Sequence, residues 1–142
     1  MQPLYNREGR AIAYITDNGV SIYFYDGEPA GWVFQESLVF AYSGKFLGWL
    51  MYGWLCDPAG NPAFFTDRSS GGPKRPAVKL RPLRAPRGVR PPRRQRQVRP
   101  SRPGMTNVWS AISDEAFFAA PPAEAGAPDS PAAEDPGEEP SE

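Results

Sequence analysis

The chain has 142 residues, enough for one domain at most, and its composition excludes several classes of function. It contains no histidine and a single cysteine, so the commonest general base is missing, and neither an intrachain disulfide nor a usual zinc site can form. No apolar run approaches the roughly 18 residues of a transmembrane helix, and the N-terminus lacks the form of a secretory signal. We therefore expect a soluble, cytoplasmic protein that uses no metal or other cofactor.

The net charge of zero conceals three segments of very different charge. Residues 1–72 carry −3, residues 73–104 carry +12 without one acidic residue, and residues 105–142 carry −9 without one basic residue. Fifteen of the 18 aromatic residues lie in residues 1–72. Because a packed core needs large apolar side chains, residues 1–72 are expected to form the folded domain.

A glycine-centred unit repeats four times in this first segment, at Gly9, Gly27, Gly44 and Gly60. Turn-forming residues precede each glycine, and aromatic and β-branched residues flank it, which is typical of a β-hairpin. Pro29 and Pro62 share one position of the unit, where a strand is expected to face solvent or to contain a bulge. An aromatic residue stands five positions after each glycine: Tyr14, Trp32, Trp49 and Phe65.

Four such hairpins cannot each bury an apolar face alone. The repeat therefore predicts an all-β fold in which four antiparallel β-hairpins are arranged with pseudo-fourfold symmetry. The four repeated aromatic residues are expected to form its structural core.

Residues 73–104 form a basic, proline-rich segment in which arginine stands at every third position over eight steps: Arg81, Arg84, Arg87, Arg90, Arg93, Arg96, Arg99 and Arg102. A period of three matches an extended polyproline II helix with the arginines along one edge. Such an edge could bind a polyanion such as RNA or DNA. It could also be a semi-rigid spacer, a segment neutralised by the chain's own acidic tail, or a ligand for a protein that reads polyproline. No aromatic residue is interleaved for base stacking, so sequence-specific readout is not expected.

Residues 105–120 are expected to begin extended and to end in a short helix capped by Ser113, with Asp114 and Glu115 in its first turn. Two helical turns are not stable alone, so the apolar side chains here need a surface. We expect them to dock on the β domain: Trp109, Ile112, Phe117 and Phe118. Residues 121–142 contain no large apolar side chain, which predicts a disordered acidic tail.

Together these features resemble the bacterial four-fold β-flower proteins. The resemblance rests on the four glycine-centred units, the opening Leu4-Tyr5-Asn6-Arg7-Glu8-Gly9, the exit Ser70-Gly71-Gly72-Pro73 and the basic stretch with its closing Trp109-Ser110 and Phe117-Phe118, and it covers roughly residues 3–118. It implies four hairpins arranged like petals, and it implies no established activity, cofactor or catalytic residue. One departure is that family members tend to have lysine and isoleucine or leucine in the basic stretch, where this chain has arginine and proline.

Catalysis would have to use carboxylates, tyrosines or Cys56, and none of these is singled out. Cys56 occupies a repeat position that is otherwise aromatic, so a buried structural thiol is expected. Tyr25 and Tyr42 could form an exposed aromatic site for a sugar or peptide, or could pack within their hairpins. We therefore expect no enzyme. The chain is interpreted as a non-enzymatic interaction or scaffold protein of unknown oligomeric state, with sequence-independent polyanion binding, modulated by the acidic tail, as the alternative.

Overall fold

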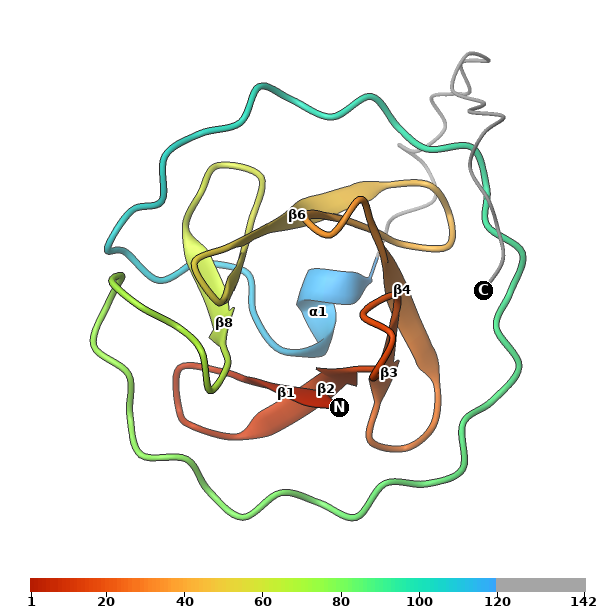
Figure 1. Ribbon diagram of the computed structural model, residues 1–142, viewed down its shortest axis with the longest axis horizontal. Helices are drawn as coiled ribbons and strands as arrows, with labels where there is room; N and C mark the ends of the chain where they lie inside the picture. The colour runs from red at the N-terminus through yellow and green to blue at the C-terminus, as the bar shows by residue number, and fades with distance from the viewer. Residues whose placement is uncertain (120–142) are drawn as a thin grey trace.

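The computed structural model describes residues 1–119, which fold into an all-β barrel and one short helix (Figure 1). The acidic tail predicted for residues 121–142 lies outside the described residues. The strands are β1 Gln2–Tyr5, β2 Ala11–Ile15, β3 Ser21–Phe24, β4 Pro29–Phe34, β5 Leu38–Phe40, β6 Phe46–Met51, β7 Trp54–Cys56 and β8 Pro62–Phe65. The helix is α1, Glu115–Phe118. Within residues 1–119 no helix has the length and apolar character needed to cross a membrane.

The strands pair antiparallel in chain order, and β1 pairs with β8 through Tyr5 and Phe65 to close the barrel. The prediction of repeated antiparallel hairpins is therefore confirmed, and each predicted glycine lies in a hairpin turn. At Gly27, for example, the backbone has φ of +96°, and its N–H donates to the carbonyl of Phe24 at 3.0 Å. A residue without a Cβ adopts this backbone conformation without steric cost, which explains the glycine.

Each hairpin also contains a register shift at the same place, which reverses the side chains that follow. The shifts fall between Leu4 and Tyr5, Ile22 and Tyr23, Val39 and Phe40, and Leu55 and Cys56. Pro29 and Pro62 pair with Tyr23 and Cys56, directly beside two of these shifts, as their shared repeat position predicted. Such bulges bend the hairpin strongly, which helps eight short strands to close into a barrel.

The bulges separate two buried clusters. The four residues before the shift, Leu4, Ile22, Val39 and Leu55, are fully buried in an aliphatic cluster that also contains Phe117 and Phe118 of α1. The residues after the shift belong to a second, largely aromatic cluster. An inner core of aliphatic side chains was not among the sequence predictions.

The four aromatic residues predicted as the core belong to this second cluster and are only 1–4% exposed. Their ring contacts are made with other aromatic residues of their own and adjacent strands. Tyr14 lies 6.1 Å from Tyr23, Trp32 lies 5.5 Å from Phe40, and Phe65 lies 5.3 Å from Tyr5. The four aromatic residues thus belong to one aromatic layer around the barrel. The aliphatic cluster that contains Phe117 and Phe118 of α1 is separate from this layer.

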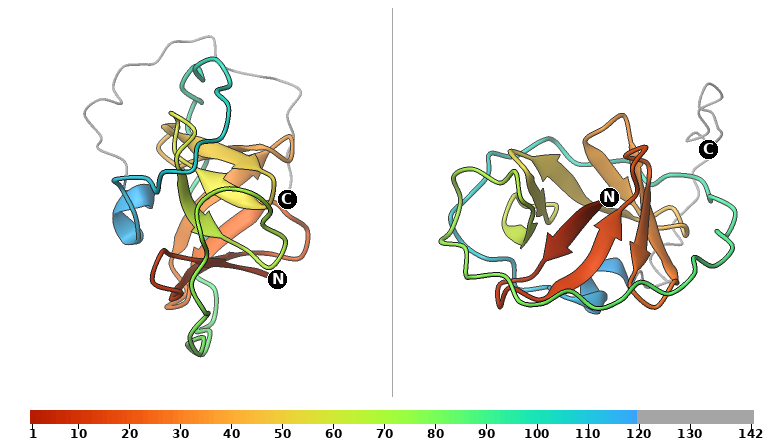
Figure 2. Two further views of the ribbon diagram at one scale, coloured as in Figure 1. Left: turned by 90° about the vertical axis from the view of Figure 1, so that its left-hand side faces the viewer. Right: turned by 60° about the horizontal axis from the view of Figure 1, so that its bottom comes forward.

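The closing segment packs on the barrel, with α1 at one end and the N-terminus at the opposite side (Figure 2). Phe117 and Phe118 are buried against Phe64, with centroids 5.4 and 5.7 Å away, and Trp109 meets Trp54 edge-on at 5.6 Å. Ile112 is 52% exposed and does not share this packing.

The N-cap of α1 is Asp114, so the assignment of Ser113 as cap was wrong. Asp114 makes no side-chain capping bond. Its carboxylate instead accepts a hydrogen bond from Asn6 Nδ2 at 2.8 Å and lies 3.6 Å from the guanidinium of Arg10. The tertiary contact to the first hairpin thus replaces the local cap.

Candidate anion-binding surface

A long segment without helix or strand encircles the barrel, drawn from green to cyan in Figure 1. We call residues 72–107 the belt; it includes the basic segment 73–104 predicted from the sequence. The carbonyl of each hairpin-turn glycine accepts a hydrogen bond from a belt N–H. The four bonds are Lys79 to Gly9 (2.9 Å), Gly88 to Gly27 (2.8 Å), Gln97 to Gly44 (2.7 Å) and Thr106 to Gly60 (3.1 Å). The donors are nine residues apart, so each hairpin binds one nine-residue unit of the belt.

The same nine-residue period is visible in the sequence, within the period of three noted above. Residues 81–89 and 90–98 both read Arg-Pro-x-Arg-x-x-Arg-x-Val. The arginines alone have a period of three. The period of nine appears in the residues between them, such as the proline at the second position and the valine at the ninth. The positions of each unit are numbered one to nine here, starting at Gly72, Arg81, Arg90 and Arg99.

The turn glycines are needed for the close approach of the belt. A Cβ built on Gly27 would lie 2.2 Å from the carbonyl oxygen of Pro86, and one on Gly44 would lie 2.0 Å from that of Gln95. Real Cβ atoms do not approach an oxygen so closely, so any other residue there would displace the belt. The glycine of the repeat therefore serves both the turn and the binding of the belt.

At position four of every unit an arginine lies over an aromatic ring of the barrel. The distances from Cζ to the ring centroid are 6.0 Å for Arg75 on Trp54, 5.5 Å for Arg84 on Tyr14, 4.1 Å for Arg93 on Trp32 and 5.8 Å for Arg102 on Trp49. Stacking of this kind is attractive because the ring face is electron-rich. The aromatic layer of the barrel is thus covered by guanidinium groups.

The two arginines at position seven make similar contacts. Arg87 lies 5.4 Å from both Tyr14 and Tyr23, and its Nε donates to the Tyr14 hydroxyl at 3.1 Å. Arg96 lies 3.9 Å from the ring of Phe34. Five of the eight predicted polyanion-binding arginines therefore lie on barrel aromatics: Arg84, Arg87, Arg93, Arg96 and Arg102.

The remaining three, Arg81, Arg90 and Arg99, all stand at position one and are exposed. Arg90 donates to Ser21 Oγ at 3.1 Å. The residues that precede them are exposed aliphatic side chains: Leu80, Val89 and Val98. Residues 1–119 hold all 16 basic residues and nine of the 16 acidic ones, a formal charge of +7. The belt surface of the described protein is thus strongly positive.

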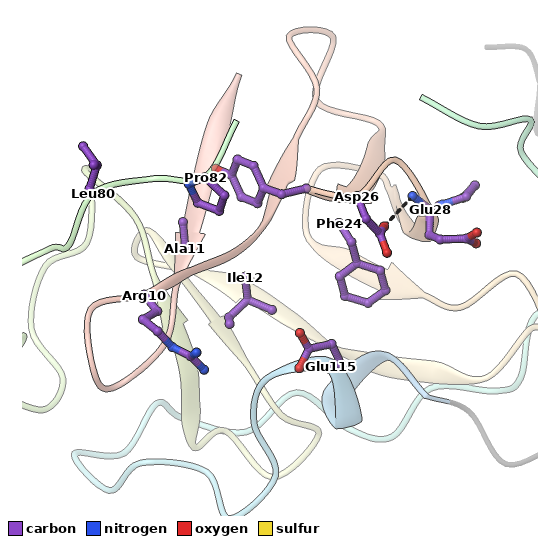
Figure 3. Close-up of a pocket in the computed structure, with 11 residues that line it drawn as sticks. Arg10, Ala11, Ile12, Phe24, Asp26, Glu28, Leu80, Pro82 and Glu115 are labelled. Atoms are coloured by element: carbon purple, nitrogen blue, oxygen red, sulfur yellow. Dashed lines mark hydrogen bonds between the residues drawn. The ribbon is translucent and has the colours of Figure 1, made fainter. Parts of the chain in front are cut away.

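Hollows lie where the belt spans from one hairpin to the next. The hollow in Figure 3 has a mixed lining: Arg10, Asp26, Glu28 and Glu115 surround it, and Leu80 and Pro82 of the belt form one side. Asp26 accepts a hydrogen bond from the backbone of Glu28 at 2.9 Å, which fixes this carboxylate in the turn. Two further hollows lie between the belt and the β2–β3 and β4–β5 loops.

The single cysteine is unsuited to covalent chemistry. Cys56 is fully buried, and burial, with the nearby charge of Asp57, raises the pKa of its thiol to about 12. A thiol held neutral in this way is a poor nucleophile. Over residues 1–119 no group of three or more His, Cys, Asp or Glu side chains could hold a metal ion. Tyr25 and Tyr42 are buried, so the alternative of an exposed aromatic site there was wrong.

Comparison with protein families matches residues 2–118 to the family described as 4-fold beta flower protein. The match spans most of the chain, and the chain belongs to this family. The family description names an architecture and no activity. Searches of curated proteins and of solved structures gave no match.

Proposed function

We propose that this chain is a non-enzymatic binding module whose belt binds anionic macromolecules, RNA or DNA, through their phosphates. The observation that carries the proposal is the placement of Arg81, Arg90 and Arg99 at the same position of successive units, exposed and at regular steps around the barrel. The belt contains no acidic residue. A phosphate backbone lying along it would meet one of these exposed arginines on three of the four units.

Base-specific recognition is not expected. The barrel aromatics beneath the belt are buried under guanidinium groups, with Trp32 and Trp49 each 2% exposed, so their faces are not available to bases. Contacts to phosphate position a nucleic acid but carry no sequence information. We therefore propose binding that depends on charge and is indifferent to sequence.

The acidic residues 121–142 are proposed to modulate this binding. They carry seven carboxylates and no basic group, against the twelve basic residues of the belt. Arginine forms bidentate bonds with carboxylate as well as with phosphate, so the two anions compete for the same groups. Removing residues 121–142 should therefore strengthen binding.

A scaffold role for a protein partner is the second candidate, and a separate observation favours it. Leu80, Leu83, Val89 and Val98 of the belt are 81–97% exposed. Aliphatic side chains add nothing to phosphate binding, whereas a protein partner could bury them. Binding of that kind would persist at high salt. A cytoplasmic location remains a proposal for either role.

Titration of labelled single-stranded RNA against the full chain and against residues 1–120, at two salt concentrations, tests the proposal. We expect the logarithm of affinity to fall by about 0.7 per logarithmic unit of salt for each phosphate neutralised. A variant with Arg81, Arg90 and Arg99 changed to Gln keeps the stacked arginines and should show a smaller slope. Absence of binding by residues 1–120 even at low salt would overturn the polyanion function and favour the scaffold role.

A further inference from the structure

The hollow between the β4–β5 loop and belt residues 96–102 differs from the two other hollows in the charge of its lining. It has a volume of about 610 Å³, within the range of small-molecule sites. The loop side contributes Gln35, Ser37 and Leu38. The belt side contributes Arg96, Arg99 and Arg102. Arg96 stands at position seven of one unit, and Arg99 and Arg102 stand at positions one and four of the next. The three arginines thus line a single concave surface.

The charge of this lining is entirely positive among the described residues. Its equivalent at the β2–β3 loop contains Asp17 beside Arg87 and Arg90. The hollow in Figure 3 contains the carboxylates of Asp26, Glu28 and Glu115. At the β4–β5 loop the position next to Ser37 is Glu36, which lies outside the lining. The two hollows at equivalent loops, β2–β3 and β4–β5, therefore differ in the charge of their linings.

Two of the three guanidinium groups are held in position. Arg96 is stacked on Phe34 at 3.9 Å, and Arg102 lies over Trp49 at 5.8 Å. A guanidinium stacked by its face keeps its N–H donors in its plane, where an oxyanion can bind them. Ser37 and Ser101 add neutral hydroxyl donors to the same lining. Ordered donors lower the entropic cost of binding an anion.

We propose that this hollow binds a chain of adjacent phosphate groups, as in an inorganic oligophosphate or the triphosphate of a nucleotide. Three arginines in a lining to which residues 1–119 contribute no carboxylate match a compact ligand of several negative charges. This inference goes beyond the proposed function, since it names one place on the belt and a small ligand. It differs from the proposed nucleic-acid binding, which would use Arg81, Arg90 and Arg99 on three successive units.

Calorimetric titration of the full chain, and of residues 1–120, with inorganic tripolyphosphate tests the site. Arg99→Ala should weaken binding about tenfold or more, as expected for loss of a charge-assisted hydrogen bond. Arg81→Ala is the matched control. Arg81 stands at the same position of its unit as Arg99, and its substitution removes the same charge. We expect it to weaken binding by less than about twofold. Equal losses in the two variants, or no binding by either chain, would overturn the proposal.

A second variant adds a charge instead of removing one. Gln35→Glu is nearly isosteric, lies on an exposed residue and places a carboxylate in the hollow. It should abolish tripolyphosphate binding, and retention of wild-type affinity would contradict the site. A nucleoside triphosphate measured in parallel separates the two sources of the ligand: tighter binding than tripolyphosphate indicates a nucleotide, and equal binding indicates the phosphate chain alone. Arg99→Ala and Arg81→Ala should weaken RNA binding equally. The RNA titration therefore tests the proposed function separately from the tripolyphosphate site.

Discussion

Replacing Gly44 by alanine should separate the belt from one hairpin. The turn at Gly44 has φ of +97°, and its Cβ would lie 2.0 Å from the carbonyl oxygen of Gln95. An L-residue with such a backbone costs about 1–2 kcal/mol. The backbone carbonyl cannot rotate away as a flexible side chain could, so the belt has to move.

The magnitude follows from the hydrogen bonds and stacked pairs that break when the belt moves. Two backbone–backbone hydrogen bonds hold it here, from the Gln97 N–H to the Gly44 carbonyl at 2.7 Å and from the Arg94 N–H to the Tyr42 carbonyl at 2.9 Å, each worth about 1 kcal/mol net. The stacked pairs of Arg93 on Trp32 and Arg96 on Phe34 add about 0.5–1 kcal/mol each. Beyond the backbone strain, the variant should therefore lose about 3–4 kcal/mol of unfolding free energy.

Gly19→Ala is the matched control. Gly19 also has positive φ, +77°, but nothing lies within 4 Å of its Cβ position, so this variant should show the strain alone. The difference of about 3 kcal/mol corresponds to roughly 10 °C in thermal midpoint for a chain of this size. Thermal unfolding followed by circular dichroism measures both variants. Equal midpoints would refute the reasoning that the turn glycines bind the belt.

Three further predictions concern stability. Phe117→Ala removes a buried ring and should cost roughly 3–5 kcal/mol in urea unfolding, whereas Ile112→Ala at its exposed site should cost less than about 0.5 kcal/mol. Ending the chain after residue 104 should lower the thermal midpoint of the barrel, because it removes α1 from one end; an unchanged midpoint would mean that α1 does not stabilise it. Burial raises the pKa of Tyr25 from 10.0 and of Cys56 from 9.0, both to about 12, so the native state holds these protons more tightly than the unfolded chain does. The thermal midpoint should therefore fall as pH rises from about 9 to 12, and the fall should be smaller in Tyr25→Phe; an identical fall in that variant would contradict the role of Tyr25.

The hairpins could be predicted from the sequence because their signals are local. Glycine at positive φ, turn formers before it and aromatic residues around it all occur within one unit, and four repetitions exclude coincidence. The bulge could be predicted in part for the same reason. A proline such as Pro62 cannot donate a backbone hydrogen bond to the neighbouring strand, so its position indicates an interruption of the pairing.

The division of the core could not be predicted in this way. Leu4 and Tyr5 are adjacent and both buried, so no polar residue marks which face is outside. Alternation of apolar and polar residues identifies an inner face only where the other face meets water. Here the belt covers the other face. In addition, the bulge reverses which side chains point to which face of the strand. The aromatic residues were therefore noticed as the core, and the aliphatic ones before the bulge were not.

The basic charge of the belt could be predicted from the sequence, but its contacts with the barrel depend on the tertiary fold. Every third residue is arginine, so the sequence alone treats Arg81, Arg84 and Arg87 as equivalent. The barrel distinguishes them because it offers one turn and one set of rings for each nine residues. All three side chains are exposed, but Arg84 and Arg87 lie over Tyr14, whereas no ring of the described residues lies beside the Arg81 guanidinium.

This distinction bears on why the belt is so rich in arginine. A barrel of eight short strands leaves an aromatic layer beneath the belt, and that layer has to be kept from water. Guanidinium groups cover it by stacking on the rings while their charged edges stay solvated, which aliphatic side chains in the same place could not do. The cover carries charge at every unit, so the protein gains a positive surface as a consequence of how its core is closed. Exposed arginines such as Arg99, for which ring stacking gives no explanation, are the ones that we propose to bind an anion.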